Sequence, residues 1–331
     1  MRKILTQPKT RTQLGLAALL CGAALNAQAG ATLAFGSSAE NQATQQFVYN
    51  FPDAVSSGNF SSQGPVTAAA GGVSASVNAW ADPSTGMFKS IAQVKMSGFT
   101  EQTNIAETYS RLDVNDLLRF EGSGSTVAVT WTLNYDTVFA GLGFEAFARV
   151  GGLSHFMQAS SFRNLSLSYE IANPSYDPGA TCTDLGSDGM YCPPETQQFI
   201  TQQEVLSKDL FREVALGGPN GIYTNGDEDN GRYTGQLTLS LLLPTQTDIR
   251  LSYTAYNGVR CFHLANCDLS SDASHSDYLG LQISPGGSFH SDSGYQYLGL
   301  AAAVPEPSSA LLASLGLVGI LAWRRREKQQ G

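Results

Sequence analysis

The amino-acid sequence predicts an all-β fold, an antiparallel β-sandwich with a jelly-roll-like body. In several stretches apolar and polar residues alternate, and this period of two places each set on one face of a strand. Turn-forming segments rich in Gly, Asn and Pro separate these stretches at fairly regular intervals. Outside the two terminal apolar segments, no window of ordinary helix length shows a 3.6-residue stripe. A parallel α/β fold would need crossover helices, so antiparallel sheets are expected.

Four stretches carry the clearest alternation, and each is predicted to be a strand with one face toward a core and the other toward water. They are residues 125–135, 164–171, 236–243 and 248–256. One helical turn is the alternative considered around residues 113–118. The residues expected on the core-facing sides are Val127, Val129, Trp131, Leu133, Tyr135, Leu165, Leu167, Tyr169, Ile171, Leu237, Leu239, Leu241, Leu243, Ile249, Leu251, Tyr253 and Ala255.

The chain is predicted to have three parts: an N-terminal segment at residues 1–29, a β-rich body at residues 30–303 and a C-terminal tail at residues 304–331. Within the body, residues 30–72 are rich in Ser, Gly, Ala and Gln, and their early part is expected to be loosely ordered. Residues 173–195 have little strand character and indicate a long surface loop pinned by a disulfide. A division of the body at this loop is the alternative to the single continuous domain that we favour.

The N-terminal segment has the pattern of a secretory signal peptide. A basic start is followed by the apolar run "LGLAALLCGAAL" at residues 14–25, which is too short to span a bilayer comfortably. Residues 27–29, Ala-Gln-Ala, then supply a small-x-small cleavage site. We therefore expect signal peptidase to leave a mature chain that begins at Gly30. Lipid attachment at Cys21 is the alternative, which the bulky residue before it disfavours.

The body is strongly acidic. The whole chain has a formal net charge of −9. Without residues 1–29 and the tail from residue 305 onward, 11 basic and 26 acidic residues remain, a net charge of −15. Such a charge disfavours nucleic acid and anionic lipid as partners, and it permits cations or basic surfaces.

Four cysteines remain after the signal peptide, and an even number in an exported chain predicts disulfides. Three pairings are possible, and the local one, Cys182–Cys192 with Cys261–Cys267, costs least in loop closure. Zinc is the alternative, because "CFHLANC" places His263 between two cysteines. The other cysteine pair has the wrong spacing for a second zinc knuckle, so disulfides are favoured.

The sequence contains no common catalytic signature: no Gly-x-Ser-x-Gly, His-Glu-x-x-His, phosphate-binding Gly-rich loop or Cys-x-x-Cys. No catalytic residue and no cofactor is therefore predicted. Several aromatic residues have no clear place in the predicted core, and a sugar-binding face built from them stays an open alternative. They are Trp80, Tyr223, Tyr233 and Tyr256.

The densest acidic cluster, "NGDEDNG" at residues 225–231, invites a calcium interpretation through Asp227 and Asp229. It fails the EF-hand register, because Asn230 stands where the loop glycine belongs and Gln236 where a bidentate Glu belongs. A solvated hairpin turn is therefore favoured, and no metal site is predicted.

The tail has three parts in order: Pro-Glu-Pro, an apolar run at residues 308–323, and three arginines. It resembles the PEP-CTERM sorting-signal family, exported proteins of Gram-negative bacteria, many from species that make an exopolysaccharide biofilm matrix. The resemblance covers about the last 28 residues and implies processing by exosortase, an inner-membrane transpeptidase-like enzyme that recognises the tail. The residues that carry it are Pro305, Glu306, Pro307, Arg324, Arg325 and Arg326.

The apolar run of the tail is predicted to be a single transmembrane sorting helix. Its 16 residues reach about 24 Å at about 1.5 Å per residue, less than the roughly 30 Å hydrocarbon core, so it suits a temporary anchor. The arginines should stay cytoplasmic, which leaves residues 305–307 at the outer face of the inner membrane for cleavage.

These features favour an exported, exosortase-sorted, non-enzymatic protein of the cell surface or extracellular matrix, associated with exopolysaccharide. Expected partners are signal peptidase and exosortase during export, then exopolysaccharide, with membrane contact only through the tail before processing. The alternative is an exported polysaccharide-binding lectin or polysaccharide-active enzyme. Two facing carboxylates in a deep cleft would favour the enzyme, and a shallow row of exposed aromatic residues the lectin.

Overall fold

A computed structural model describes residues 30–41, 46–52, 55–56, 65–97, 104–141, 155–185, 189–216, 222–226, 230–264, 266–275 and 278–297. Within these ranges every strand pairing is antiparallel, and the one helical element is a 3₁₀ turn, η3 (Pro194–Thr196). The all-β, antiparallel prediction is confirmed. The predicted signal peptide (1–29) and sorting helix (308–323) lie outside the described residues.

Eight of the described strands pair in a nested order. The innermost pair is β9 with β12, then come β8 with β14 and β7 with β15, and the outermost pair is β6 with β16. Because β9 also lies beside β15, and β8 beside β16, this is the strand order of a jelly roll. The bounds are β6 (Met87–Met96), β7 (Asn104–Glu121), β8 (Thr126–Ala140), β9 (His155–Ala172), β12 (Phe199–Leu216), β14 (Gly231–Pro244), β15 (Asp248–Phe262) and β16 (Cys267–Ala273).

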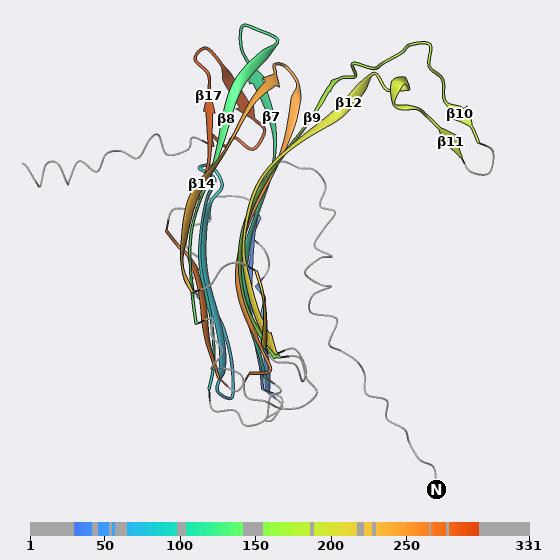
Figure 1. Cartoon of the computed structure of the whole chain (residues 1–331). Coiled ribbons are helices and arrows are strands. Elements are labelled where there is room, and N and C mark those ends of the chain that lie inside the picture. Colours follow the sequence, from blue (N-terminus) through green and yellow to red (C-terminus); the bar gives the residue numbers. More distant parts are fainter. Residues whose placement is uncertain are drawn as a thin grey trace, which may run out of the picture.

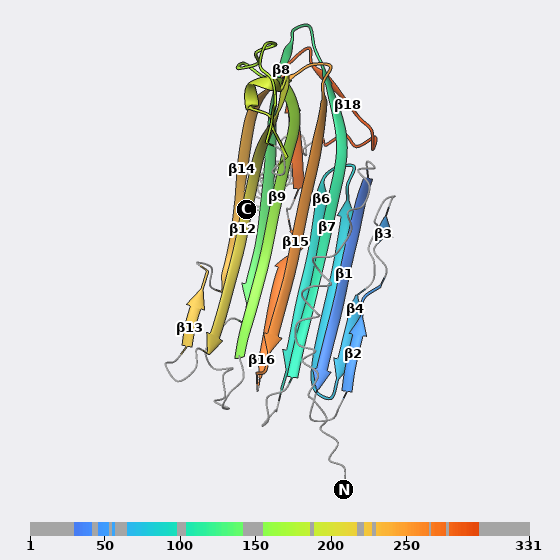
Figure 2. The ribbon, with the colours of Figure 1, turned by 90° about the vertical axis from the view of Figure 1, so that its right-hand side faces the viewer.

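Further strands widen both sheets. In the described residues sheet A runs β13-β12-β9-β15-β7-β1-β2, with β3 and β18 beside it, and sheet B runs β14-β8-β16-β6-β5-β4, with β17 between β8 and β6. Figure 1 shows the sheets as two facing layers that bend together, so that the outer face of sheet A is concave, and Figure 2 views that face. The added strands are β1 (Gly30–Asn41), β2 (Gln46–Asn50), β3 (Val55–Ser56), β4 (Val66–Ala70), β5 (Val73–Asp82), β13 (Ile222–Asn225), β17 (Tyr278–Ile283) and β18 (Ser288–Ser291).

The core lies between the two sheets, as the alternating pattern predicts. Trp131 and Leu133 of sheet B are fully buried, and so are Leu165 and Tyr253 of sheet A. In the described part of the chain the apolar core falls into two clusters. The larger cluster contains most of the residues predicted to face inward, whereas Tyr135 and the leucines of β14 up to Leu241 are only partly buried.

A belt of buried polar side chains also joins the two sheets. The Asn257 amide of β15 donates hydrogen bonds to Ser90 of β6 and to the Ser271 carbonyl of β16, and the Ser271 hydroxyl donates back to the Asn257 side-chain oxygen. Hydrogen bonds between hydroxyl groups also connect the sheets, at Ser90–Ser110 and Thr137–Ser161. We call these residues the polar belt: Ser90, Ser110, Thr137, Ser161, Asn257 and Ser271.

The expectation of loose order in the early part of residues 30–72 is wrong where the structure describes it. β1 pairs with β7 along its whole length, and Leu33 and Ala39 are fully buried. Residues 35–39 are all buried because both faces of β1 are covered there, which removes the polar-apolar alternation that marks a strand in the sequence.

The helical turn considered at residues 113–118 is also wrong, since these residues lie within β7. Val114 and Leu118 face the core, and so does Asp116, which is 5% exposed. A carboxylate at an inward position hides the period of two from sequence inspection.

Residues 173–198, which we call the arm, connect β9 to β12 and contain β10 (Thr183–Asp184), β11 (Met190–Tyr191) and η3. Figure 1 shows that β9 and β12 extend past the sandwich and carry the arm away from it, on the outer side of sheet A. The predicted loop at residues 173–195 lies in the arm. It does not divide the body, because the strands on either side of it pair with each other.

Candidate ligand-binding face

Not all residues singled out in the sequence fall in the described part of the chain. The sorting residues Pro305, Glu306, Pro307, Arg324, Arg325 and Arg326 lie outside it, and so do Asp227 and Asp229 of the acidic cluster. The sorting and calcium interpretations of these residues therefore stay predictions. No group of three or more potential metal ligands occurs among the residues that are described.

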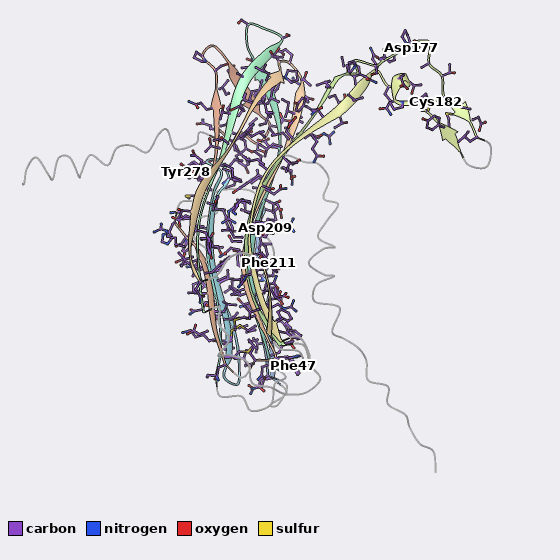
Figure 3. The ribbon with its side chains drawn as sticks, viewed as in Figure 1. Phe47, Asp177, Cys182, Asp209, Phe211 and Tyr278 are labelled. Carbon is purple, nitrogen blue, oxygen red and sulfur yellow. A yellow bond between two sulfur atoms is a disulfide. The ribbon has the colours of Figure 1, made fainter. Side chains whose placement is uncertain are left out.

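The four cysteines form the local pairs in this structure. Cys182–Cys192 closes a short loop in the arm, and Cys261–Cys267 joins the end of β15 to the start of β16. Figure 3 labels Cys182 near the far end of the arm. Both thiols of "CFHLANC" are thus bonded to each other and are not available as zinc ligands.

A row of aromatic side chains crosses the concave face of sheet A. Tyr109 on β7, Tyr256 on β15 and Phe162 on β9 stack in sequence, with ring centroids 6.3 and 5.1 Å apart, and Phe51 continues the row beyond Tyr109 at 6.2 Å. We call these four residues the aromatic row. Because neighbouring rings turn their faces to each other, the row presents mainly ring edges and hydroxyl groups to solvent.

Glycine makes room for this row on the strands beneath it. A Cβ atom on Gly258 would lie 2.5 Å from the Tyr256 hydroxyl oxygen, so the Tyr256 ring leans along β15 over the bare backbone of Gly258. Directly opposite Gly258, on the neighbouring strand β9, lies Ser160. These small residues leave a depression beside the row.

A second aromatic pair lies on the other side of the depression. Phe156 and Phe262 stack with centroids 5.2 Å apart, and the Arg260 guanidinium lies over both rings at 5.2 and 5.1 Å. Arg260 Nε is also 3.5 Å from a carboxylate oxygen of Glu107 on β7. Arg260 is therefore held by cation–π contacts on one side and by an ion pair on the other.

The depression is a shallow pocket of about 100 Å³, which we call the concave-face pocket. It lies near the middle of sheet A, since its residue Ser160 is opposite Phe211 of β12, which Figure 3 labels about halfway along the sandwich. Its lining residues are Glu107, Gln158, Ser160, Tyr256, Gly258, Val259 and Arg260.

Burial sets the protonation of the groups around this pocket. It raises the pKa of the Glu107 carboxyl, and the Arg260 guanidinium offsets part of that shift. Burial also raises the pKa of the Tyr109 and Tyr256 hydroxyls, and the nearby Glu107 carboxylate adds to the shift. Both tyrosines therefore keep their O–H donors at neutral pH.

The tail is where the chain matches a known protein pattern. A comparison with protein-family models matches residues 303–326 to the PEP-CTERM protein-sorting motif. The chain carries a PEP-CTERM sorting motif. Such a motif implies export, sorting at the cell surface or membrane, and an exosortase partner. Comparisons with curated proteins and with solved structures gave no match.

The PEP-CTERM motif follows closely on a buried anchor. Asp116 accepts hydrogen bonds from the Tyr297 hydroxyl at 2.9 Å, the Ser291 hydroxyl at 2.5 Å and the Ser293 backbone N–H at 3.0 Å. Tyr297 is fully buried and packs edge-on against Trp131. We call these contacts the C-terminal latch. The first residue of the matched motif is six positions after Tyr297.

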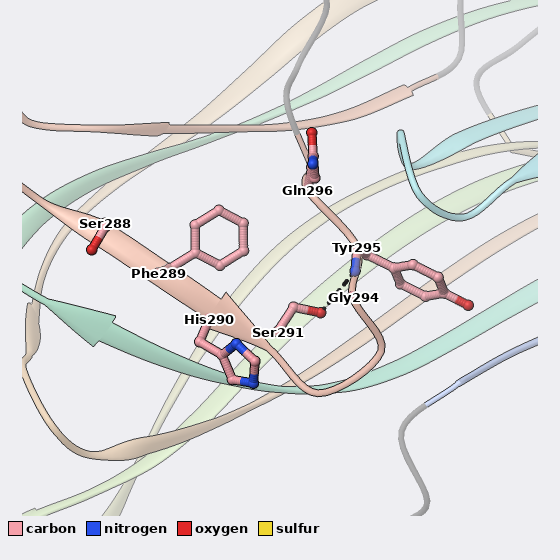
Figure 4. A pocket seen from close by; sticks show the side chains of 7 residues that line it. All are labelled: Ser288, Phe289, His290, Ser291, Gly294, Tyr295 and Gln296. Atoms are coloured by element: carbon pink, nitrogen blue, oxygen red, sulfur yellow. Dashed lines mark hydrogen bonds between the residues drawn. The ribbon is translucent and has the colours of Figure 1, made fainter.

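A second pocket, of about 420 Å³, lies beside the C-terminal latch (Figure 4). Its lining comes from one continuous segment, residues 288–296, in which Ser291 accepts a hydrogen bond from the Tyr295 backbone N–H. Because a single segment just before the PEP-CTERM motif forms this pocket, we do not treat it as a binding site built from several strands. No helix in the described residues is long and apolar enough to cross a membrane.

Sequence inspection noted Tyr256 without placing it and missed the other residues of the concave-face pocket. A signal exists for those on β15, where the outward residues Tyr256, Gly258, Arg260 and Phe262 alternate with inward ones. Of the other unassigned aromatic residues, Tyr233 packs on Phe139, Trp80 is half-buried on the non-core face of β5, and the side chain of Tyr223 is outside the described set.

Proposed function

We propose that this is an exported, exosortase-sorted protein of the cell surface or extracellular matrix of a Gram-negative bacterium, associated with exopolysaccharide and without catalytic activity. The PEP-CTERM motif at residues 303–326 carries the proposal. The signal-peptide pattern at residues 1–29 supports it, since cleavage before Gly30 would release the chain at the first residue of β1.

The C-terminal latch supports processing at the motif. Tyr297 is the last described residue and is packed in the core, whereas Pro305 is eight positions further along the chain. Eight extended residues span at most about 28 Å, so exosortase would act on a segment close to the folded body. Cleavage near residues 305–307 would leave every described contact of the body intact.

Mass spectrometry of the mature, surface-exposed protein tests this proposal. We expect a chain that begins at Gly30 and yields no peptide from residues 311–326, and we expect Glu306→Ala to retain the tail and to mislocalise the protein. An intact tail in the surface product, or unchanged processing of Glu306→Ala, would contradict exosortase sorting. Glu327→Ala, outside the matched motif, is the matched control and should be processed normally.

A second candidate function is polysaccharide binding by the body, and the concave-face pocket favours it. The pocket is shallow, lies beside an aromatic row, and has a single carboxylate, Glu107, which is paired with Arg260. A glycosidase would instead place two carboxyl groups across the scissile bond, about 5 to 10 Å apart. A binding assay of the mature protein on the exopolysaccharide of the producing strain tests this function. We expect the protein to be retained, and we expect the retention to be lost when the polysaccharide is removed.

A further inference from the structure

The chemistry of the concave-face pocket points to a ligand class. We infer that it binds one sugar ring of a neutral polysaccharide, with Glu107 and Arg260 as the charged contacts, Gln158 and Ser160 as neutral ones, and the Tyr256 ring edge and hydroxyl group on one side. This inference rests on the polysaccharide-binding function proposed above and specifies its site.

The size of the pocket fits one unit of a longer chain. Its volume of about 100 Å³ is well below the roughly 300 to 1,000 Å³ of pockets that enclose drug-sized ligands. It opens on the concave face of sheet A, which continues along the strands on both sides (Figure 2). A polymer can therefore lie along the face while one ring enters the pocket.

The polar groups of the pocket match hydroxyl groups, which both donate and accept hydrogen bonds. The Glu107 carboxylate accepts, the Arg260 guanidinium donates, and the Gln158 amide and Ser160 hydroxyl do both. The faces of the Tyr256 ring are covered by Tyr109 and Phe162, so Tyr256 offers the sugar its ring edge and its hydroxyl group, a further hydrogen-bond donor.

The pocket is also held in shape before any ligand arrives. Arg260 is fixed by the Phe156 and Phe262 rings and by Glu107, and Tyr256 is fixed between Tyr109 and Phe162. Side chains that are already ordered lose little entropy when they bind, which matters for a site with few contacts.

Charge decides between neutral and anionic polysaccharides. The Glu107–Arg260 pair leaves the pocket itself near neutrality, while the body carries a net charge of −15 from 26 acidic and 11 basic residues. A polyanion would be repelled by the surface around the pocket, and a neutral chain would not.

The test is affinity electrophoresis of the mature protein in gels that contain one polysaccharide each. The neutral set is dextran, a soluble β-1,3-glucan, galactomannan and any neutral polysaccharide purified from the producing strain, and the anionic set is alginate and polygalacturonate. Ser160→Phe fills the pocket from an outward position, and Ser168→Phe, outward on the same strand but away from the pocket, is the matched control. Melting curves confirm that both variants are folded.

We expect the native protein and Ser168→Phe to be retarded by at least one neutral polysaccharide, and Ser160→Phe to bind it at least tenfold more weakly. Equal retardation of all three proteins would overturn the site and leave polysaccharide binding in place. Retardation by the anionic set alone would overturn the ligand class. No retardation of the native protein by any gel would overturn both this inference and the second candidate function. If Ser160→Phe does not fold, Gln158→Ala and Glu107→Gln replace it with the same expected loss.

Discussion

The Asn257 side chain connects three strands, since it bonds to β6 and β16 of sheet B while its own strand, β15, lies in sheet A between β7 and β9. It is fully buried, so its partners have no access to water if the amide is removed. A satisfied network of this kind specifies how two sheets face each other, whereas apolar contacts alone tolerate sliding.

Asn257→Ala should therefore lower the free energy of unfolding by about 3 kcal/mol, because it leaves the Ser271 hydroxyl and the Ser90 groups without this partner and opens a small cavity. Asn115→Ala, at an exposed position on β7, should change it by less than about 0.5 kcal/mol. Urea denaturation measures both. Equal effects of the two substitutions would show that the polar belt contributes nothing specific.

Glu107 gives the stability a defined dependence on pH. The pKa of Glu107 is higher in the folded protein than in the unfolded chain, so as pH rises the unfolded chain loses this proton first. Stability therefore falls as pH rises from the unfolded pKa through the folded one, because the folded protein must then hold a buried, ionised carboxylate. Glu107→Gln removes this cost. Chemical denaturation should show that the free energy of unfolding gained by Glu107→Gln over the native protein is larger at pH 7 than at pH 4. A stability difference that does not change with pH, or that reverses, would contradict the assigned cause.

At the scale of elements, one disulfide lies in the sandwich and the other in the arm, and we expect these two regions to differ in stability. Cys261 and Cys267 are buried in the smaller apolar cluster and link two jelly-roll strands, whereas Cys182 and Cys192 are in the exposed arm. Local opening of an arm that contributes little to the core does not require the sandwich to unfold.

Replacing both Cys261 and Cys267 by Ala should lower the free energy of unfolding by about 2 to 3 kcal/mol. The matched double replacement at Cys182 and Cys192 should leave it within about 0.5 kcal/mol of the native value and increase protease cleavage between residues 173 and 198. Denaturation curves and limited proteolysis distinguish the two variants. A large loss of global stability from the arm variant would mean that the arm is part of the cooperative core.

The strand pattern of these elements was predictable only where one face is covered. β8 and β15 alternate along most of their length, and the inward positions of Trp131 and Tyr253 follow from the period of two. β1 is covered on both faces at residues 35–39, and β7 carries Asp116 at an inward position. Both were misjudged, because the period of two reports the contrast between a wet and a dry face.

At the scale of the whole molecule, the C-terminal latch places the end of the body in the core, just before the sorting motif. β18 adds to sheet A and Tyr297 then bonds through its backbone oxygen to Leu281 of sheet B. The segment therefore closes one side of the sandwich, and the folded body and the motif are separated by only a few residues.

Ending the chain after Ala303 should leave the melting temperature unchanged, because the described contacts all precede this point. Ending it after Gly287 should lower the free energy of unfolding by about 3 kcal/mol or more, since Asp116 loses the hydroxyl donors of Ser291 and Tyr297 and the core loses the buried Tyr297 ring. Calorimetry of the two truncated proteins checks this. Similar melting temperatures would show that the latch does not stabilise the body.

The export signal, the sorting tail and most core-facing strand positions are legible in the sequence because each depends on residues that are close neighbours in the chain. The concave-face pocket is different: Glu107, Ser160 and Arg260 lie far apart in the sequence and meet only through the register of β7, β15 and β9. A shift of one residue in either pairing would move Arg260 away from Glu107 and turn alternate side chains into the core. That register is set by packing between the two sheets, which involves the whole sandwich at once.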